Sequence, residues 1–155
     1  SGKRPGVRKP ETLYALTPEA ERLFPKAYHL LFNALLEALQ TRLSPSEIEQ
    51  MLREIGRELA NERSTSGRES GIRERAEVAL EVLEDLGGLA ELRENDGQMV
   101  IRGYSCPLAA AVKEHPAVCQ LAEALLAEIL GVPVHETCER NGQPRCVFRV
   151  ESEGL

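Results

Sequence analysis

The chain has 155 residues, of which 42% are hydrophobic and 28% charged, a composition typical of one folded domain with its own core. No apolar run approaches the roughly 20 residues of a membrane span and no signal peptide begins the chain, so we expect a cytoplasmic protein without a membrane partner. Trp is absent and aromatic residues are few, so the core should consist mainly of Leu, Val, Ile and Ala.

The net charge of −6 is distributed unevenly along the chain. The first ten residues contain four basic side chains and no acidic one, whereas the rest has 15 basic and 25 acidic residues. The four are Lys3, Arg4, Arg8 and Lys9. A basic tip on an acidic body is typical of a protein whose tip alone contacts a polyanion, such as DNA phosphates or a minor groove. A solvated basic tail has the same composition.

Residues 12–24 predict a short strand that leads into a long helix. Thr17 is a suitable N-cap, followed by Pro18 at the first helical position. The helix should continue to Leu39, and its apolar stripe is so wide that we expect part of it to face another subunit. The stripe consists of Leu23, Phe24, Ala27, Leu30, Leu31, Ala34, Leu35, Ala38 and Leu39.

The next two helices have boundaries that can be read from the sequence. The run Ser44-Pro45-Ser46-Glu47 is a capping-box motif ahead of a helix with apolar residues at helical spacing. The polar residues 61–71 predict a loop. A third helix is expected over about 72–86, where Gly87-Gly88 should end it.

The hydrophobic pattern then changes to that of strands. Asp96-Gly97 predicts the turn of a β-hairpin, and two short helices should follow, broken near His115-Pro116. Gly131 should end the second of these helices, and a last hairpin is expected around the turn at 141–144. The fold class is therefore predicted as α+β.

These elements suggest three parts. Residues 1–17 form the basic tip and its strand, residues 18–62 a helical linker and dimerisation segment, and residues 72–155 a small domain with two β-hairpins and helices. The third part contains every cysteine of the chain.

The four cysteines are the most informative residues. Cys106, Cys119, Cys138 and Cys146 form no CxxC pair, and a reducing cytoplasm disfavours disulfides. Cys106 should lie between a strand and a helix start, where backbone amides favour a thiolate. A three-residue loop centred on Gly142 would place Cys138 directly across from Cys146.

Thiols with this spacing can meet only through the tertiary fold. If they do, an iron–sulfur cluster or zinc could bind them, since both accept thiolate ligands. The alternative is simple burial, because a reduced cysteine often fills space in a core, as Cys146 would beside Phe148 and Val150.

Other chemistry has little support in the sequence. His29, His115 and His135 are each expected to be structural, although His115 lies between two candidate ligands and could replace one of them. The acidic residues fall on helix surfaces near arginines, and no nucleophile or phosphate-binding motif is present. We therefore expect a protein that is not an enzyme.

Two groups of segments resemble known regulators. RPGVRKPETLYALTPEAERLFPKAY (4–28) resembles the wing, last strand and following helix of ArsR/DeoR-like winged helix-turn-helix repressors. REIGRELA, RAEVALEVLEDLGGLAEL, CPLAAAVKEHPAVCQLAEALLAEILGVPVHET and NGQPRCVFRV resemble the sensor region of SufR-type regulators, which are iron–sulfur-cluster-binding repressors of iron–sulfur assembly genes. Together the segments span nearly the whole chain.

The resemblance implies a cytoplasmic homodimer that binds operator DNA and responds to iron or redox status. It implies a cluster held by Cys106, Cys119 and Cys146, with Cys138 as a fourth ligand whose spacing departs from the familiar pattern. Lys3, Arg4, Arg8 and Lys9 would belong to a wing remnant that contacts DNA.

No helix-turn-helix precedes Lys3, so weak or no DNA binding is expected of this fragment by itself. Two alternatives remain at this stage. One is a sensor domain for an apolar small molecule, and the other is a structural zinc site, with zinc or no metal in place of the cluster.

Overall fold

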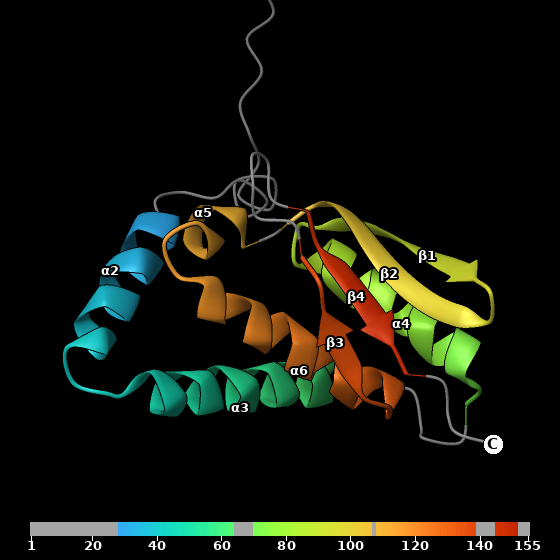
Figure 1. Ribbon diagram of the computed structural model, residues 1–155, viewed down its shortest axis with the longest axis horizontal. Helices are drawn as coiled ribbons and strands as arrows, with labels where there is room; N and C mark the ends of the chain where they lie inside the picture. The colour runs from blue at the N-terminus through green and yellow to red at the C-terminus, as the bar shows by residue number, and fades with distance from the viewer. Residues whose placement is uncertain (1–27, 64–69, 107, 139–144, 152–155) are drawn as a thin grey trace, which may run out of the picture.

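The computed structural model describes residues 28–63, 70–106, 108–138 and 145–151 (Figure 1). The predicted wing remnant, with Lys3, Arg4, Arg8 and Lys9, lies outside the described residues, as does the predicted helix start at Thr17. The rest shows an α+β fold, which confirms the predicted class.

Two helices open the described part of the chain, α2 (Tyr28–Gln40) and α3 (Pro45–Arg63). The predicted capping box at the start of α3 is confirmed. The Ser44 N–H donates to Glu47 Oε2 at 2.7 Å, and the Glu47 N–H donates to Ser44 Oγ at 3.3 Å. These reciprocal bonds satisfy two backbone donors that the helix itself leaves free.

Helix α4 (Ile72–Asp85) ends where its glycines predict. Gly87 has a φ of 88°, and the N–H of Gly88 donates to the Leu83 carbonyl at 2.9 Å, the pattern of a Schellman motif. Strands β1 (Leu89–Asn95) and β2 (Gln98–Ser105) follow. Asp96-Gly97 joins them with φ angles of 50° and 78°, the left-handed pair that a two-residue hairpin requires.

The remaining elements confirm the predicted order. They are α5 (Ala109–Val112), the 3₁₀ turn η1 (Pro116–Val118), α6 (Cys119–Leu130), β3 (Val134–Glu136) and β4 (Val147–Val150). Gly131 ends α6 with a φ of 68°. The predicted second hairpin does not stand apart, because β4 pairs with β2, giving one antiparallel sheet in the order β1-β2-β4-β3.

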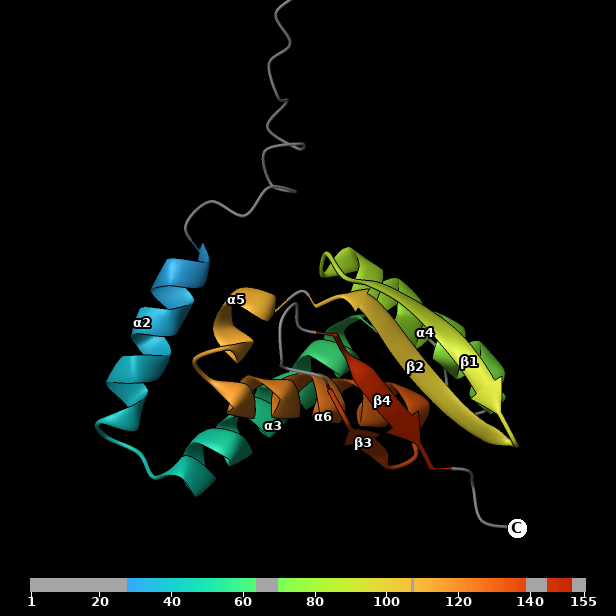
Figure 2. The same cartoon turned by 45° about the horizontal axis from the view of Figure 1, so that its top comes forward.

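The core lies between the sheet and the helices behind it. One face of the sheet packs on α4 and α6, while α3 lies alongside α6 on the side away from the sheet (Figures 1 and 2). The α3–α6 approach is close: a Cβ added at Gly56 would lie 2.3 Å from the Leu121 carbonyl oxygen. The buried core residues here are Ala60, Ala76, Ala79, Val82, Leu83, Ile101, Leu125, Leu126, Ile129, Leu130, Val132, Val134, Phe148 and Val150.

Helix α2 stands at one end of the molecule, beside α5 (Figure 2). It buries Leu36 and part of Phe32 against a smaller cluster that contains Val112 and Val118. Neither Phe32 nor Leu36 was in the predicted apolar stripe, whereas three of its leucines, Leu30, Leu31 and Leu35, are exposed and Leu39 is half-buried. Tyr28, Leu30, Leu31 and Leu35 have exposed fractions of 71%, 61%, 67% and 56%. Within the described residues, no helix has both the length and the apolar character that crossing a membrane requires.

Candidate metal centre

The four cysteines come together at the corner where the end of β2, the start of α6, the end of β3 and the start of β4 meet. All four lie in the described residues and are free thiols. Cys106, Cys119 and Cys146 line one cavity, and Cys106 and Cys138 both pack on the cluster that contains Cys119. We call these four cysteines, together with Glu136, the thiol site.

Cys106 and Cys146 are placed by the pairing of the β2 end with the residues before β4. Cys106 directly follows β2, as predicted, and Cys146 directly precedes β4. The Gly103 N–H donates to the Cys146 carbonyl oxygen at 2.7 Å. A Cβ at Gly103 would lie 3.0 Å from the Cys146 Cβ, so a side chain at this position would press on the Cys146 backbone.

Cys138 is placed by the register of β3 with β4. The paired residues run from Val134 opposite Val150 to Glu136 opposite Phe148. The Val147 N–H donates to Cys138 Sγ at 3.4 Å, which extends the pairing beyond the strands. Continued by two residues, this register puts Cys138 across from Cys146, as the sequence predicted. The loop itself lies outside the described residues.

Cys119 is the first residue of α6, and only 4% of it is exposed. Its sulfur, the sulfur of Cys138 and a carboxylate oxygen of Glu136 all lie within 4.8 Å of one another. Such a group could hold a metal ion. Sequence analysis did not single out Glu136. The only available signal was its position two residues before Cys138 at the end of a strand, which places both side chains on one face.

Hydrogen bonds among the sulfurs shift the thiol pKa values in opposite directions. Bonds from Cys119 and Cys146 lower the pKa of Cys138, against the effect of burial. A bond from Cys146 lowers the pKa of Cys106, with the Leu108 N–H as a further donor. The pKa of Cys146 is raised, because its proton bonds to Cys106 and Cys138 and because the thiol is buried. The lowered pKa values favour the thiolate form at Cys106 and Cys138, which is the form that binds a cation.

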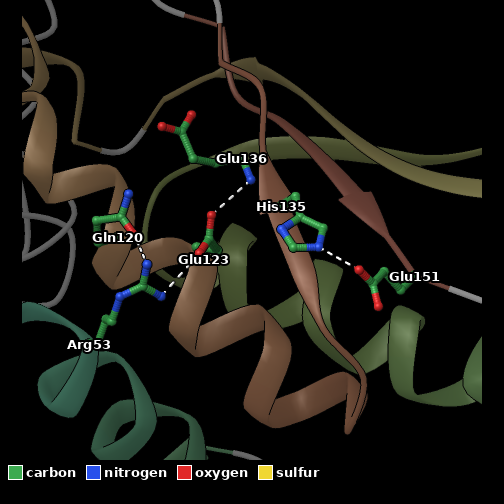
Figure 3. A network of polar contacts seen from close by, with 6 residues as sticks. All are labelled: Arg53, Gln120, Glu123, His135, Glu136 and Glu151. Atoms are coloured by element: carbon green, nitrogen blue, oxygen red, sulfur yellow. Dashed lines mark hydrogen bonds and ion pairs between the residues drawn. The ribbon is translucent and has the colours of Figure 1, made fainter. Parts of the chain in front are cut away.

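A polar network ties the thiol site to the helices (Figure 3). Arg53 of α3 pairs with Glu123 of α6 at 3.0 Å and also bonds Gln120. The second oxygen of Glu123 accepts the Glu136 N–H at 2.9 Å, so α3 and α6 hold the end of β3 in place. Glu136 Oε2 in turn accepts the Cys138 N–H at 3.0 Å. Cys138 is thus positioned by this polar network as well as by the neighbouring sulfurs.

Two of the three histidines are exposed and one is buried. His29 is exposed, and His135 points away from the core toward Glu151, as Figure 3 shows. His115 precedes the 3₁₀ turn and is buried, with 6% exposed. It does not lie within the metal-holding group of the thiol site; it belongs to a separate one with Glu37 and Glu114.

No protein-family model matches the chain, and no curated protein is significantly similar to it. Cysteine and acidic side chains are placed so that they could hold a metal ion.

Proposed function

We propose that this chain is the sensor and dimerisation region of a cytoplasmic DNA-binding transcriptional regulator. Its thiol site would hold an iron–sulfur cluster whose gain or loss reports iron or redox status. The observation that carries the proposal is the convergence of four thiols from four separate segments, up to 40 residues apart in sequence. Burial in a core would not require the four sulfurs to be neighbours.

The donors at the site fit a cluster. Cys106, Cys119, Cys138 and Cys146 supply the four thiolates that clusters take, in a setting that already favours thiolate at two of them. A single zinc ion with four thiolates needs sulfurs only about 3.8 Å apart. Among the described residues, no three of the sulfurs lie within even 4.8 Å of one another. A cluster, in which each iron takes its own thiolate, suits a more extended set of sulfurs.

The cluster would supply redox chemistry and a dependence on iron. The chain's own residues would do the rest. Cys106 and Cys146 would fix the end of β2 to the residues before β4, while Cys138 and Cys119 would fix the β3 end to the start of α6. Loss of these links would free the α5–η1 segment, which packs directly on α2. The position of α2 would then depend on the state of the site.

The exposed face of α2 supports the dimer part of the proposal. Leu31 and Leu35 follow Tyr28 at helical spacing and point away from α5, and all three are more than half exposed. A partner helix from a second copy would cover this apolar face. The same helix that responds to the thiol site would thus lie in the interface.

Anaerobic purification tests the cluster. We expect a brown protein with stoichiometric iron and acid-labile sulfide, and loss of both in Cys106→Ser and Cys119→Ser. Ser105→Ala, one residue away on β2, should keep them and serves as the control. A colourless protein, or cysteine variants with unchanged iron and sulfide, would refute the cluster.

Sedimentation tests the dimer. Leu31→Glu combined with Leu35→Glu should give a monomer, because burying two carboxylates in an apolar interface is unfavourable. Leu89→Glu, at an exposed leucine on β1, should leave the dimer intact. A wild-type chain that sediments as a monomer at high concentration would remove the dimer from the proposal.

One observation favours a second candidate, a structural zinc site. Cys119, Cys138 and Glu136 form the compact group within 4.8 Å, and zinc accepts sulfur and carboxylate ligands together. A colourless protein with one zinc per chain, lost on Glu136→Gln and Cys138→Ser but not on Cys106→Ser, would establish this alternative in place of the cluster.

A further inference from the structure

One face of α2 makes polar contacts with the segment between α5 and η1. Asn33, Glu37 and Gln40 follow one another at spacings of four and three residues, so they lie on one side of the helix. Asn33 Nδ2 donates to the Ala110 carbonyl oxygen at 3.2 Å, and Gln40 Nε2 lies 3.2 Å from His115 Nδ1. Glu37, between them, points its carboxylate at the same segment.

Three metal-ligating groups meet at this contact. An oxygen of Glu37, an oxygen of Glu114 and a ring nitrogen of His115 all lie within 4.8 Å of one another. A zinc ion with bonds of about 2.1 Å needs its ligand atoms roughly 3.4 Å apart. Both glutamates are exposed, so small rotations of their side chains can close the difference.

His115, the third member of this group, has one unsatisfied ring nitrogen. The residue is 6% exposed, and its Nε2 has no hydrogen-bond partner among the described residues. A buried polar atom without a partner is unfavourable by about 1–3 kcal/mol. If the Gln40 amide turns its oxygen to Nδ1–H, the Nε2 lone pair becomes free for a metal. This is the usual arrangement of a metal-binding histidine, whose second nitrogen donates to an oxygen.

The charges also favour a cation. The carboxylates of Glu37 and Glu114 make no hydrogen bond or ion pair within the part of the chain that the structure describes. Two carboxylates held this close repel each other unless a cation lies between them. Imidazole and carboxylate together suit zinc and similar divalent ions, whereas an iron–sulfur cluster takes thiolates.

We propose that Glu37, Glu114 and His115 form a second metal site, for a divalent transition-metal ion such as Zn²⁺, separate from the thiol site. The ion fastens α2 to the segment that leads through η1 to Cys119. Helix α2 otherwise contacts its neighbours through few side chains, chiefly Leu36 and Phe32. The ion therefore limits the movement of α2 relative to the thiol site.

Cobalt titration of the full chain tests the proposal, because Co²⁺ bound by thiolates shows strong near-ultraviolet charge-transfer absorption and Co²⁺ bound by nitrogen and oxygen does not. After the thiol site is filled, wild type should bind one more equivalent without further charge-transfer absorption. Glu37→Gln with Glu114→Gln should weaken this equivalent by well over tenfold, and Gln40→Leu by about tenfold. These exposed positions avoid the folding risk of a change at buried His115.

Glu49→Gln with Glu58→Gln, two exposed positions on α3, is the matched control and should retain wild-type affinity. Hydrogen exchange of α2 should slow when Zn²⁺ fills the second site in wild type and in the control, but not in the Glu37/Glu114 variant. The proposal is wrong if every bound equivalent brings thiolate absorption, or if the Glu37/Glu114 variant binds as wild type does. Binding without slower exchange would overturn the role in fastening α2.

Discussion

The body of the molecule and the region around the thiol site, which we call the corner, are stabilised by different interactions. The body, made of α3, α4, α6 and the sheet, contains a continuous cluster of 14 buried apolar residues. The cluster next to the thiol site has only five, one of them Cys119, around the four-residue helix α5. Burial of apolar surface therefore stabilises the body, whereas the corner has less of it and, under the proposal above, would depend on the cofactor that its sulfurs bind.

Removal of the cofactor is expected to have the largest effect, and it should be confined to the corner. A ligand present at a hundred times its Kd stabilises the state that binds it by about 2.7 kcal/mol. Amides of α5, η1 and the first turn of α6 should therefore exchange up to about a hundredfold faster after removal. Those in the middle of α3 should not change. Hydrogen exchange measures the rates in both regions. An equally large increase in α3 would contradict the idea that the cofactor stabilises the corner alone.

Gly56→Ala should destabilise the body and leave cofactor binding by the remaining folded protein unchanged. The new Cβ would lie 2.3 Å from the Leu121 carbonyl oxygen, in a helix backbone that cannot easily move. Overpacking of this kind destabilises a protein by up to about 3 kcal/mol, whereas the higher helix propensity of alanine stabilises the helix by about 1 kcal/mol. We therefore expect the free energy of unfolding to fall by about 2 kcal/mol. Urea unfolding measures it. Gly71→Ala, where nothing lies within 4 Å, should cost no more than about 1 kcal/mol.

Gly103→Ala should lower the cofactor affinity of the thiol site more than it lowers the stability of the body. Its Cβ would meet the Cys146 Cβ at 3.0 Å, close enough to shift that backbone by a few tenths of an ångström. Substitutions that disturb the residues around metal ligands lower metal affinity by about 10–100-fold, and we expect a loss of about tenfold here. Cofactor dissociation measured beside the unfolding midpoint separates the two effects. Unchanged affinity would show that Cys146 is not a ligand.

Ser44→Ala should lower the stability of the body by about 1 kcal/mol, the usual cost of losing an N-cap. Ser44 Oγ is the acceptor for the Glu47 N–H at the start of α3. Ser46→Ala, on the exposed first turn, should cost less than about 0.5 kcal/mol. Urea unfolding of both variants checks the pair. Equal losses would mean that the capping bond contributes nothing.

The smallest effect concerns the other half of the capping box. The Ser44 backbone N–H, followed by its side chain, lowers the pKa of Glu47 below 4.5. Because the folded state favours the carboxylate, the contribution of Glu47 is present above pH 4.5 and is lost as the pH falls through its folded pKa. The stability difference between wild type and Glu47→Gln should therefore shrink on acidification. A difference that stays constant from neutral to acid pH would exclude this role.

The local elements were predictable because their signals are local. The capping box at Ser44, the glycines after α4 and the Asp96-Gly97 turn each act within a few residues, and each ends or begins an element where the sequence placed it. Even the register of Cys138 opposite Cys146 followed from the length of one loop. Predictions about the wing, the cluster and the operator stay predictions.

The order of the elements, the α+β class and the choice of the cysteines as the unusual residues could all be read from sequence patterns. Which side chains meet depends on long-range packing: Glu136 joins Cys119 and Cys138, β4 pairs with β2, and α2 turns Leu36 inward and Leu31 outward. Helical periodicity shows that a face is apolar but not which neighbour covers it. That choice depends on packing between segments far apart in the chain, for which no short stretch of sequence carries a signal.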